Sequence, residues 1–206
     1  MSVLIIDYGM GNLGSVRRSL EECGGEAFIS RDPSDLERAA HVILPGVGAF
    51  PDGMRCLREQ GWIEPLKRTV LDEEVPLLGI CLGMQLLASV GTEGEQCDGL
   101  GLIPGRVERM TGCAGGERIP HVGWNEVYAE GGSPLLDGVE DGTDFYFVHS
   151  FRFLPDEVEH IIATTPYCGE VVSAVAHGTV FGTQFHPEKS SRAGFRILEN
   201  FLALTG

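Results

Sequence analysis

The chain has 206 residues, 43% of them hydrophobic and 22% charged, which is the composition of one globular domain with a sizeable core. Acidic residues outnumber basic residues by 30 to 15, and the formal net charge of −15 disfavours binding to nucleic acid or anionic membranes, because their phosphates would be repelled. We therefore predict one domain, residues 1–206, and exclude a disordered chain.

Short apolar runs alternate with helix-like stretches in the first half of the chain. Strands are predicted at residues 3–6, 27–29, 42–44 and 77–80. Helices are predicted at residues 16–23, in one amphipathic region that runs through Leu57, Ile63 and Leu66 to Glu74, and at residues 82–90. This alternation indicates a parallel sheet with helices on both faces.

Gly, Pro and Asp interrupt the second half of the chain at short intervals. Candidate strands lie near residue 107 and at 126–128, 145–148, 161–164, 171–176 and 180–185, before a closing helix around 196–204. Short strands with such spacing are typical of antiparallel hairpins. The predicted class is therefore α/β, with hairpins added to a mostly parallel sheet.

No pattern in the sequence indicates export, a membrane span or a metal site. No stretch approaches the ~20 apolar residues of a membrane span, and the first residues lack a basic signal-peptide start. The cysteines form no C-x-x-C pair and the histidines no H-x-x-x-H pair. We expect a cytoplasmic protein without metal or cofactor. Its six cysteines should be reduced: Cys23, Cys56, Cys81, Cys97, Cys113 and Cys168.

The loop after the first predicted strand carries a glycine pattern that points to nucleotide binding. Gly9-Met10-Gly11-Asn12-Leu13-Gly14 spells G-x-G-x-x-G between a strand and a helix, and Asp32 follows near the end of the second strand. This is the dinucleotide fingerprint with an acid in roughly the ribose-binding place. Alternatively, the glycines only shape a loop at the carboxyl end of the strand.

A second motif places a cysteine where α/β hydrolases carry their nucleophile. Gly79-Ile80-Cys81-Leu82-Gly83 is G-x-C-x-G between an apolar strand and a helix. A sharp turn there lifts the side chain out of the sheet, and the glycines allow strand and helix to pack closely. The positive N-terminal end of the helix favours a thiolate. The alternative is a buried structural cysteine.

An acid–base partner for this thiol is available near the C-terminus. Pro187 pushes His186 into an extended conformation, in which side chains two residues apart face the same side. Glu188 can then bond one ring nitrogen of His186 and leave the other for Cys81. The tripeptide alone is weak evidence, but its pairing with the G-x-C-x-G turn indicates nucleophilic catalysis.

A glycine-containing loop follows the third predicted strand. In Pro45-Gly46-Val47-Gly48, backbone N–H groups can turn toward developing negative charge. The N–H groups of Val47 and Gly48, together with that of Leu82, are candidate oxyanion donors, each worth ~3 kcal/mol in the transition state. A plain strand-to-helix turn is the alternative.

These motifs resemble those of the class I (Cys-His-Glu) glutamine amidotransferases. More narrowly, the chain is similar to the glutaminase subunits of imidazole glycerol phosphate synthases, and the similarity extends over nearly all of it. The narrower resemblance rests on the blocks at residues 7–13, 44–50, 79–86, 120–125, 147–150 and 184–190. It implies a three-layer fold with a central, mostly parallel sheet, helices on both faces and added antiparallel hairpins in the second half.

The resemblance also implies the reaction. Cys81 would attack the side-chain amide of glutamine, His186 would pass a proton to the departing ammonia, and water would release glutamate from a thioester. The residues implied to surround the bound glutamine are Gln85, Glu93, His149 and Ser150. A carboxylate at Glu93 suits the ammonium group of the substrate, whereas a hydrogen-bonded core histidine is the alternative for His149.

The same resemblance implies a heterodimer for histidine biosynthesis, in which ammonia passes to a partner (β/α)₈ cyclase. That partner would make imidazole glycerol phosphate and aminoimidazole carboxamide ribotide. The residues implied to contact it are Gly11, Asn12, His121, Trp124, Asn125 and Lys189. For Trp124, a buried core position is the alternative. Another Cys-His-Glu amidotransferase or hydrolase and a dinucleotide-binding module remain alternatives for the whole chain.

Overall fold

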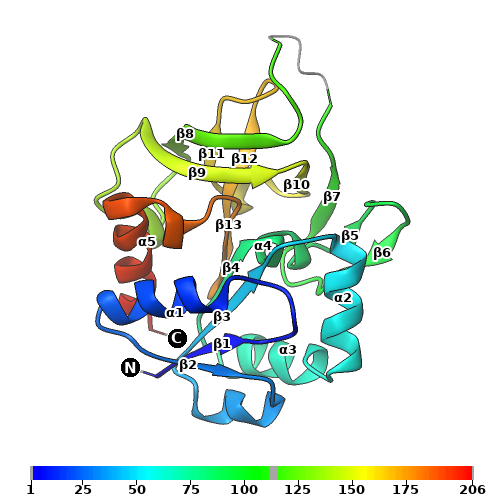
Figure 1. Ribbon diagram of the computed structural model, residues 1–206, viewed down its shortest axis with the longest axis vertical. Helices are drawn as coiled ribbons and strands as arrows, with labels where there is room; N and C mark the ends of the chain where they lie inside the picture. The colour runs from blue at the N-terminus through cyan, green and yellow to red at the C-terminus, as the bar shows by residue number, and fades with distance from the viewer. Residues whose placement is uncertain (1, 112–115, 206) are drawn as a thin grey trace.

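The computed structural model describes residues 2–111 and 116–205 (Figure 1). In the first half, strands alternate with helices as predicted. These elements are β1 (Ser2–Ile6), α1 (Leu13–Glu22), β2 (Glu26–Ser30), η1 (Pro33–Arg38), β3 (His41–Gly46), α2 (Phe50–Glu59), α3 (Ile63–Leu71), β4 (Leu77–Cys81) and α4 (Leu82–Leu86).

The second half is mostly strands. They are β5 (Val90–Gly91), β6 (Cys97–Asp98), β7 (Gly105–Arg109), β8 (His121–Ala129), β9 (Thr143–His149), β10 (Phe151–Pro155), β11 (Ile161–Thr165), β12 (Val171–His177) and β13 (Val180–Thr183). Short 3-10 turns lie between some of them, and a helix closes the chain: η2 (Pro134–Leu136), η3 (Val158–His160), η4 (Pro187–Lys189) and α5 (Ser191–Ala203).

Within the described residues, nine strands form one sheet in the order β2-β1-β3-β4-β13-β12-β11-β8-β9. The pairs from β2 to β13 are parallel, and the pairs from β13 to β9 are antiparallel. The predicted sheet with added antiparallel strands is therefore present. Strand β13 differs from the prediction, because it lies parallel to β4 and extends the parallel half of the sheet.

Helices cover both faces of this sheet (Figure 1). On one face, α1 and α5 contribute Val16, Leu20, Ile197 and Phe201 to a buried cluster with β1, β4 and β9. On the other face, α2 and α3 bury their apolar sides in a second cluster. Burial of such side chains stabilises the fold by about 25 cal/mol for each Å² of apolar surface removed from water.

The helical region predicted to end at Glu74 is two helices. Helix α2 ends at Glu59 and α3 begins at Ile63, and Gly61 between them has φ 73°, a left-handed conformation that ends a helix and that glycine adopts without strain. The apolar periodicity continues across the break because both helices pack their apolar side against the same face of the sheet.

The helix predicted at residues 82–90 is shorter than expected. Helix α4 ends at Leu86, and Val90–Gly91 instead form β5 in a second, four-stranded sheet with the order β10-β7-β5-β6 among the described residues. Residues 82–88 are all buried, so their apolar run lacks the polar face from which a helix end is recognised. Strands β5, β6 and β10 had no clear signal in the sequence.

The cysteines differ from the expectation at one position. Cys23, Cys56, Cys81 and Cys97 carry free thiols. Cys168 is disulfide-bonded, so the expectation of a reduced thiol is wrong there, and Cys113 lies outside the described residues. No helix within residues 2–111 and 116–205 is long and apolar enough to cross a membrane.

Candidate active site

Strand register brings three of the predicted motifs to one edge of the large sheet. Gly46 at the end of β3 pairs with Cys81 at the end of β4. On the other side of β4, Thr183 at the end of β13 pairs with Ile80, so the next residue along each parallel strand, Gln184 and Cys81, are neighbours. The loop after β3, the cysteine and the segment leading to His186 therefore meet at the carboxyl ends of three adjacent strands.

Cys81 lies on the sharp turn that the sequence predicts. It has φ 55° and ψ −107° between β4 and α4, an unusual backbone conformation for a residue with a side chain. Gly83 explains why the motif needs glycine, because a Cβ there would overlap the carbonyl of Leu44. The side chain of Cys81 is buried, with 6% exposure, and it borders a pocket.

His186 and Glu188 form a close pair beside this cysteine. The Nδ1 atom of His186 lies 2.8 Å from Oε1 of Glu188, and the two side chains are 3% and 1% exposed. The Nε2 atom of His186 has no hydrogen-bond partner among the described residues. Because Glu188 accepts the proton on Nδ1, Nε2 is the atom left to exchange a proton with the sulfur or a substrate.

The charge state of His186 follows from these neighbours. Burial by itself lowers the pKa of the imidazole, but Cys81 and Glu188 outweigh burial and raise the pKa of His186 to about 9. The ring therefore carries a proton at neutral pH. A protonated imidazole next to a thiol stabilises the thiolate form and can act as a general acid.

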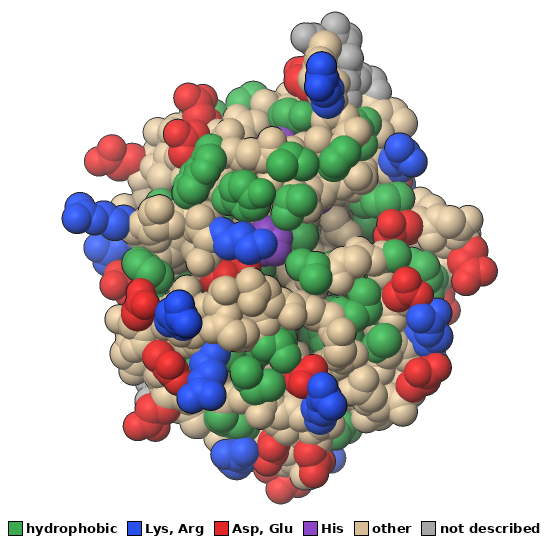
Figure 2. Space-filling model, viewed as in Figure 1, with side chains coloured by type: hydrophobic (Ala, Val, Ile, Leu, Met, Phe, Trp, Pro, Cys, Tyr) green, Lys and Arg blue, Asp and Glu red, His purple; other side chains and the backbone are tan. Residues whose placement is uncertain are grey.

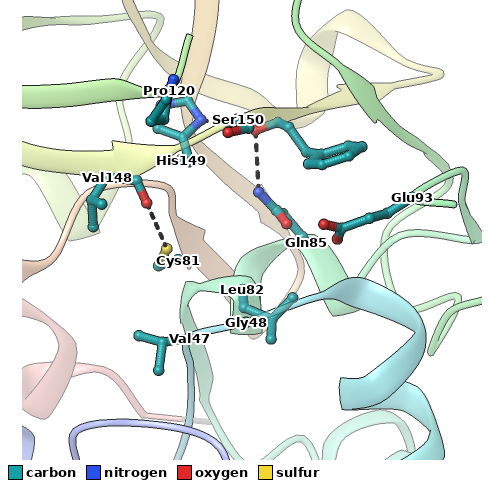
Figure 3. A pocket seen from close by; sticks show the side chains of 11 residues that line it. Val47, Gly48, Cys81, Leu82, Gln85, Glu93, Pro120, Val148, His149 and Ser150 are labelled. Carbon is teal, nitrogen blue, oxygen red and sulfur yellow. Dashed lines mark hydrogen bonds between the residues drawn. The ribbon is translucent and has the colours of Figure 1, made fainter.

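The pocket has a volume of about 330 Å³ and contains all of the predicted oxyanion and glutamine-binding residues (Figure 3). Cys81 and Val47 lie toward one end and Glu93 toward the other, with Gln85 between them. The sequence did not point to Pro120, Val148 and Phe151. The predicted residues that line the pocket are Val47, Gly48, Cys81, Leu82, Gln85, Glu93, His149 and Ser150.

Glu93 is held by the start of helix α2. Its Oε2 atom accepts a hydrogen bond of 2.8 Å from the backbone N–H of Phe50. No side chain caps this helix end at Ala49, so the carboxylate partly satisfies the free N–H groups there. The remaining acceptor capacity of Glu93 faces the pocket and suits a positively charged group (Figure 3).

His149 and His121 form a chain of hydrogen bonds that ends at the pocket. Nδ1 of His149 donates to the carbonyl of Phe151 at 2.8 Å, and Nε2 of His149 accepts from Nδ1 of His121 at 3.1 Å. Nε2 of His121 accepts from the amide of Asn125 at 3.2 Å. Burial lowers the pKa of both histidines to about 4, so both rings are neutral, as the chain requires.

The predicted partner-contact residues fall into two groups. Trp124 is 52% exposed, so the alternative of a buried core position is wrong, and Asn12 and Lys189 are also exposed. Gly11 and Asn125 are half-buried. His121 is only 2% exposed and faces inward, where it stacks between the rings of Phe147 and Tyr167.

Apolar side chains gather on the outer face of β8 and β9 (Figure 2). Val122 pairs with Val148, and Trp124 pairs with Tyr146 in an edge-to-face contact of 6.1 Å between ring centroids. The ammonium group of Lys189 lies 5.8 Å from the centroid of the Tyr146 ring. We call these five residues the β8–β9 patch, and it adjoins the pocket because Val148 belongs to both.

Asp32, the acid of the dinucleotide pattern, has a local structural role. Its Oδ1 atom accepts a hydrogen bond of 3.0 Å from the backbone N–H of Ser34 at the start of η1. Asn12, in the glycine pattern itself, similarly accepts from the backbone N–H of Ser15 at the start of α1. These contacts account for both residues without a nucleotide.

Gln184 is a pocket-adjacent residue that the sequence analysis missed. It is fully buried, and its Nε2 atom lies 3.7 Å from Sγ of Cys81. The sequence quoted Gln184 within the block around His186 but gave no reason to single it out. The signal that could have found it is the parallel pairing of β4 and β13, which is a tertiary feature.

Comparisons with known proteins agree with this geometry. The family model "Glutamine amidotransferase class-I" matches residues 4–204. "Imidazole glycerol phosphate synthase subunit HisH" of Moorella thermoacetica is 48% identical over 199 residues, which cover 97% of this chain and 93% of the relative. The subunit of the same name from Chromobacterium violaceum is 46% identical and covers 100% of this chain and 99% of the relative.

Solved structures show the same fold at lower identity. The structure of PurLQS from Thermotoga maritima matches with a TM-score of 0.77 at 20% identity, covering 98% of this chain and 97% of that one. A glutamine amidotransferase crystal structure matches with a TM-score of 0.76 at 22% identity, covering 97% and 96%. With a family model matched over residues 4–204 and relatives that align over nearly the whole length, the chain belongs to the class-I glutamine amidotransferase family.

Proposed function

We propose that this chain is the glutaminase subunit of an imidazole glycerol phosphate synthase and supplies ammonia to a cyclase partner. The observation that carries the proposal is the thiol of Cys81 at the pocket, next to a protonated His186 that is held by Glu188. The full-length relatives named as this subunit support the assignment. A cytoplasmic location is part of the proposal.

In the proposed reaction, the thiolate of Cys81 attacks the side-chain amide carbon of glutamine. The N–H groups of Leu82, Val47 and Gly48 stabilise the oxyanion that develops on the amide oxygen. The tetrahedral intermediate collapses when His186 donates its proton to the departing nitrogen, which leaves as ammonia. Water, deprotonated by His186, then attacks the thioester, so that glutamate leaves and the thiolate is restored.

Substrate recognition uses the opposite end of the pocket. Glu93 is placed to pair with the ammonium group of glutamine, and Ser150 and His149 border the space between Glu93 and Cys81. The amide nitrogen of Gln85 already donates to the carbonyl of Phe151 at 3.2 Å and to Gln184 at 2.9 Å. Gln85 therefore offers the substrate its carbonyl oxygen and not a donor.

The β8–β9 patch is the proposed contact with the cyclase. Exposed apolar side chains beside an active site mark interaction surfaces, and Trp and Tyr are typical anchors there. The acidic chain, with its net charge of −15, handles zwitterionic glutamine, while the phosphate-bearing substrate belongs to the partner. Because Val148 lies in both the patch and the pocket, docking directly borders the glutamine site.

Glutamate release measured with and without the partner tests this proposal. We expect slow release by the chain alone and at least tenfold faster release when the cyclase of the same genome and its ligand are present. An unrelated (β/α)₈ barrel at the same concentration is the control. Glutaminase activity that the cyclase leaves unchanged would contradict the subunit assignment and favour another Cys-His-Glu amidotransferase.

Substitution of Trp124 tests the docking surface. We expect Trp124→Ala to weaken cyclase binding by about 2 kcal/mol, or roughly 30-fold in Kd, because a large exposed ring is lost from the patch. Tyr128→Ala is the matched control, since Tyr128 is an exposed aromatic residue farther along β8. Isothermal titration calorimetry measures both, and equal affinities for the two variants would rule out the patch as the contact.

A further inference from the structure

We propose that Gln184 is a further catalytic residue, which donates a hydrogen bond to the sulfur of Cys81 and stabilises its thiolate, and that Gln85 is the residue that positions it. This inference rests on the proposed role of Cys81 as nucleophile. It concerns two amide side chains and the sulfur atom, all three of them buried.

The sheet register fixes Gln184 beside the nucleophile. Thr183 and Ile80 pair across parallel strands β13 and β4, so Gln184 and Cys81 each stand one residue beyond the paired positions. The backbone N–H of Gln184 donates to the carbonyl of Ser173 on β12 at 2.8 Å, which holds the residue in line with the sheet. Its side chain is then directed at Cys81 with little freedom, because it is 0% exposed.

The orientation of the Gln184 amide follows from its neighbours. The carbonyl of Phe151 can only accept, so the group of Gln85 that lies 3.2 Å from it must be the NH₂. This same NH₂ lies 2.9 Å from Gln184, which must therefore present its oxygen to Gln85. The NH₂ of Gln184 is left facing the sulfur of Cys81 at 3.7 Å.

The environment of the sulfur gives this donor a chemical consequence. The thiol of Cys81 donates to the carbonyl of Val148 at 3.9 Å, a contact that favours the protonated sulfur (Figure 3). Once the proton leaves, that carbonyl has nothing to accept and its dipole repels the anion. The NH₂ of Gln184 interacts more strongly with the thiolate than with the thiol, because hydrogen bonds to charged groups are the stronger ones.

Five titratable groups also face this site or the pocket that it borders. His186 follows β13 and is backed by Glu188, Tyr8 follows β1, His149 ends β9, and Glu93 lies across the pocket. None of them contacts the side-chain amide of Gln184 by a hydrogen bond in the described part of the chain. A change confined to that amide therefore leaves these charges in place.

Alkylation of Cys81 by iodoacetamide, followed from pH 4 to pH 10 by mass spectrometry on the full chain, tests the proposal. We expect Gln184→Met, which has similar length but no donor, to raise the pH of half-maximal alkylation rate by about one pH unit. Gln184→Asn should act in the same direction, because its shorter amide no longer reaches the sulfur. Gln85→Met should produce a smaller rise.

Thr183→Val is the matched control for disturbing the same buried strand. It removes the hydrogen bond from the Thr183 hydroxyl to the carbonyl of Phe185, so we expect a lower Tm and an unchanged alkylation profile. Unchanged profiles in Gln184→Asn and Gln85→Met would overturn the inference even if Gln184→Met does not fold. Failure of the wild-type chain to react at Cys81 would instead refute the proposed function itself.

Discussion

Replacement of Cys81 by alanine is expected to abolish glutamate release, with a loss of about 10⁴-fold or more, because no other thiol borders the pocket among the described residues. The substitution removes the nucleophile and leaves the surrounding turn intact, since alanine needs no space beyond that of cysteine. Measured in the complex with the cyclase, the loss should fall on kcat. A glutamine-mimicking alkylator should no longer label the variant.

Cys97→Ala is the matched control for this experiment. Cys97 is a free, half-buried thiol in β6, which belongs to the small sheet and does not line the pocket. It should therefore keep wild-type activity and labelling. Continued labelling of Cys81→Ala at another cysteine, or residual glutaminase activity above about 1% of wild type, would refute the assignment of the nucleophile.

Replacement of Glu188 by glutamine is expected to lower kcat by about 10²- to 10⁴-fold. The carboxylate holds Nδ1 of His186 at 2.8 Å and helps to keep the ring protonated. Glutamine has almost the same shape but carries no charge, so the pKa of His186 should fall toward the value that burial favours. The general acid is then lost at neutral pH although the packing is kept.

The same variant predicts a pH-dependent stability difference with a definite sign. The pKa of His186 is raised from 6.5 to about 9 on folding, so its protonation contributes stability fully below about pH 6.5 and loses it as the pH rises through about 9. Chemical denaturation should therefore show the largest gap between wild type and Glu188→Gln at pH 6. The gap should narrow toward pH 10.

Glu108→Gln controls for the removal of a carboxylate that pairs with a cation at the surface. Glu108 accepts from Arg152 at 2.8 Å, and its partner lowers its pKa, which places its titration in the acid range, far from pH 9. A stability gap for Glu188→Gln that stays constant between pH 6 and pH 10 would show that His186 does not titrate as we infer.

Much of the fold could be predicted because its signals are local. The apolar strands at β1, β3 and β4 and the amphipathic side of α5 follow from periodicity, which depends only on neighbours along the chain. The split between α2 and α3 and the short α4 could not be predicted in the same way. In both places a continuous apolar pattern hides a change of backbone direction that packing decides.

The nucleophile turn shows the same division at the site. Glycines around Cys81 indicated a sharp strand-to-helix turn, and the structure contains it with φ 55°. The pairing of His186 with Glu188 was also predictable, since residues two apart face one side of an extended segment. The position of Trp124 was not predictable, because a strand residue can face the core or the solvent and only the tertiary packing selects one.

The sequence by itself determined the chemistry: the length, the acidic charge and the motifs around Cys81 and His186 were sufficient to indicate an α/β glutamine amidotransferase. Only the tertiary structure decided that Gln184 touches the nucleophile and that His121 is buried behind the patch. The physical reason is that these contacts arise from the register between strands distant in the chain. Such register depends on how whole elements pack, and no local pattern records it.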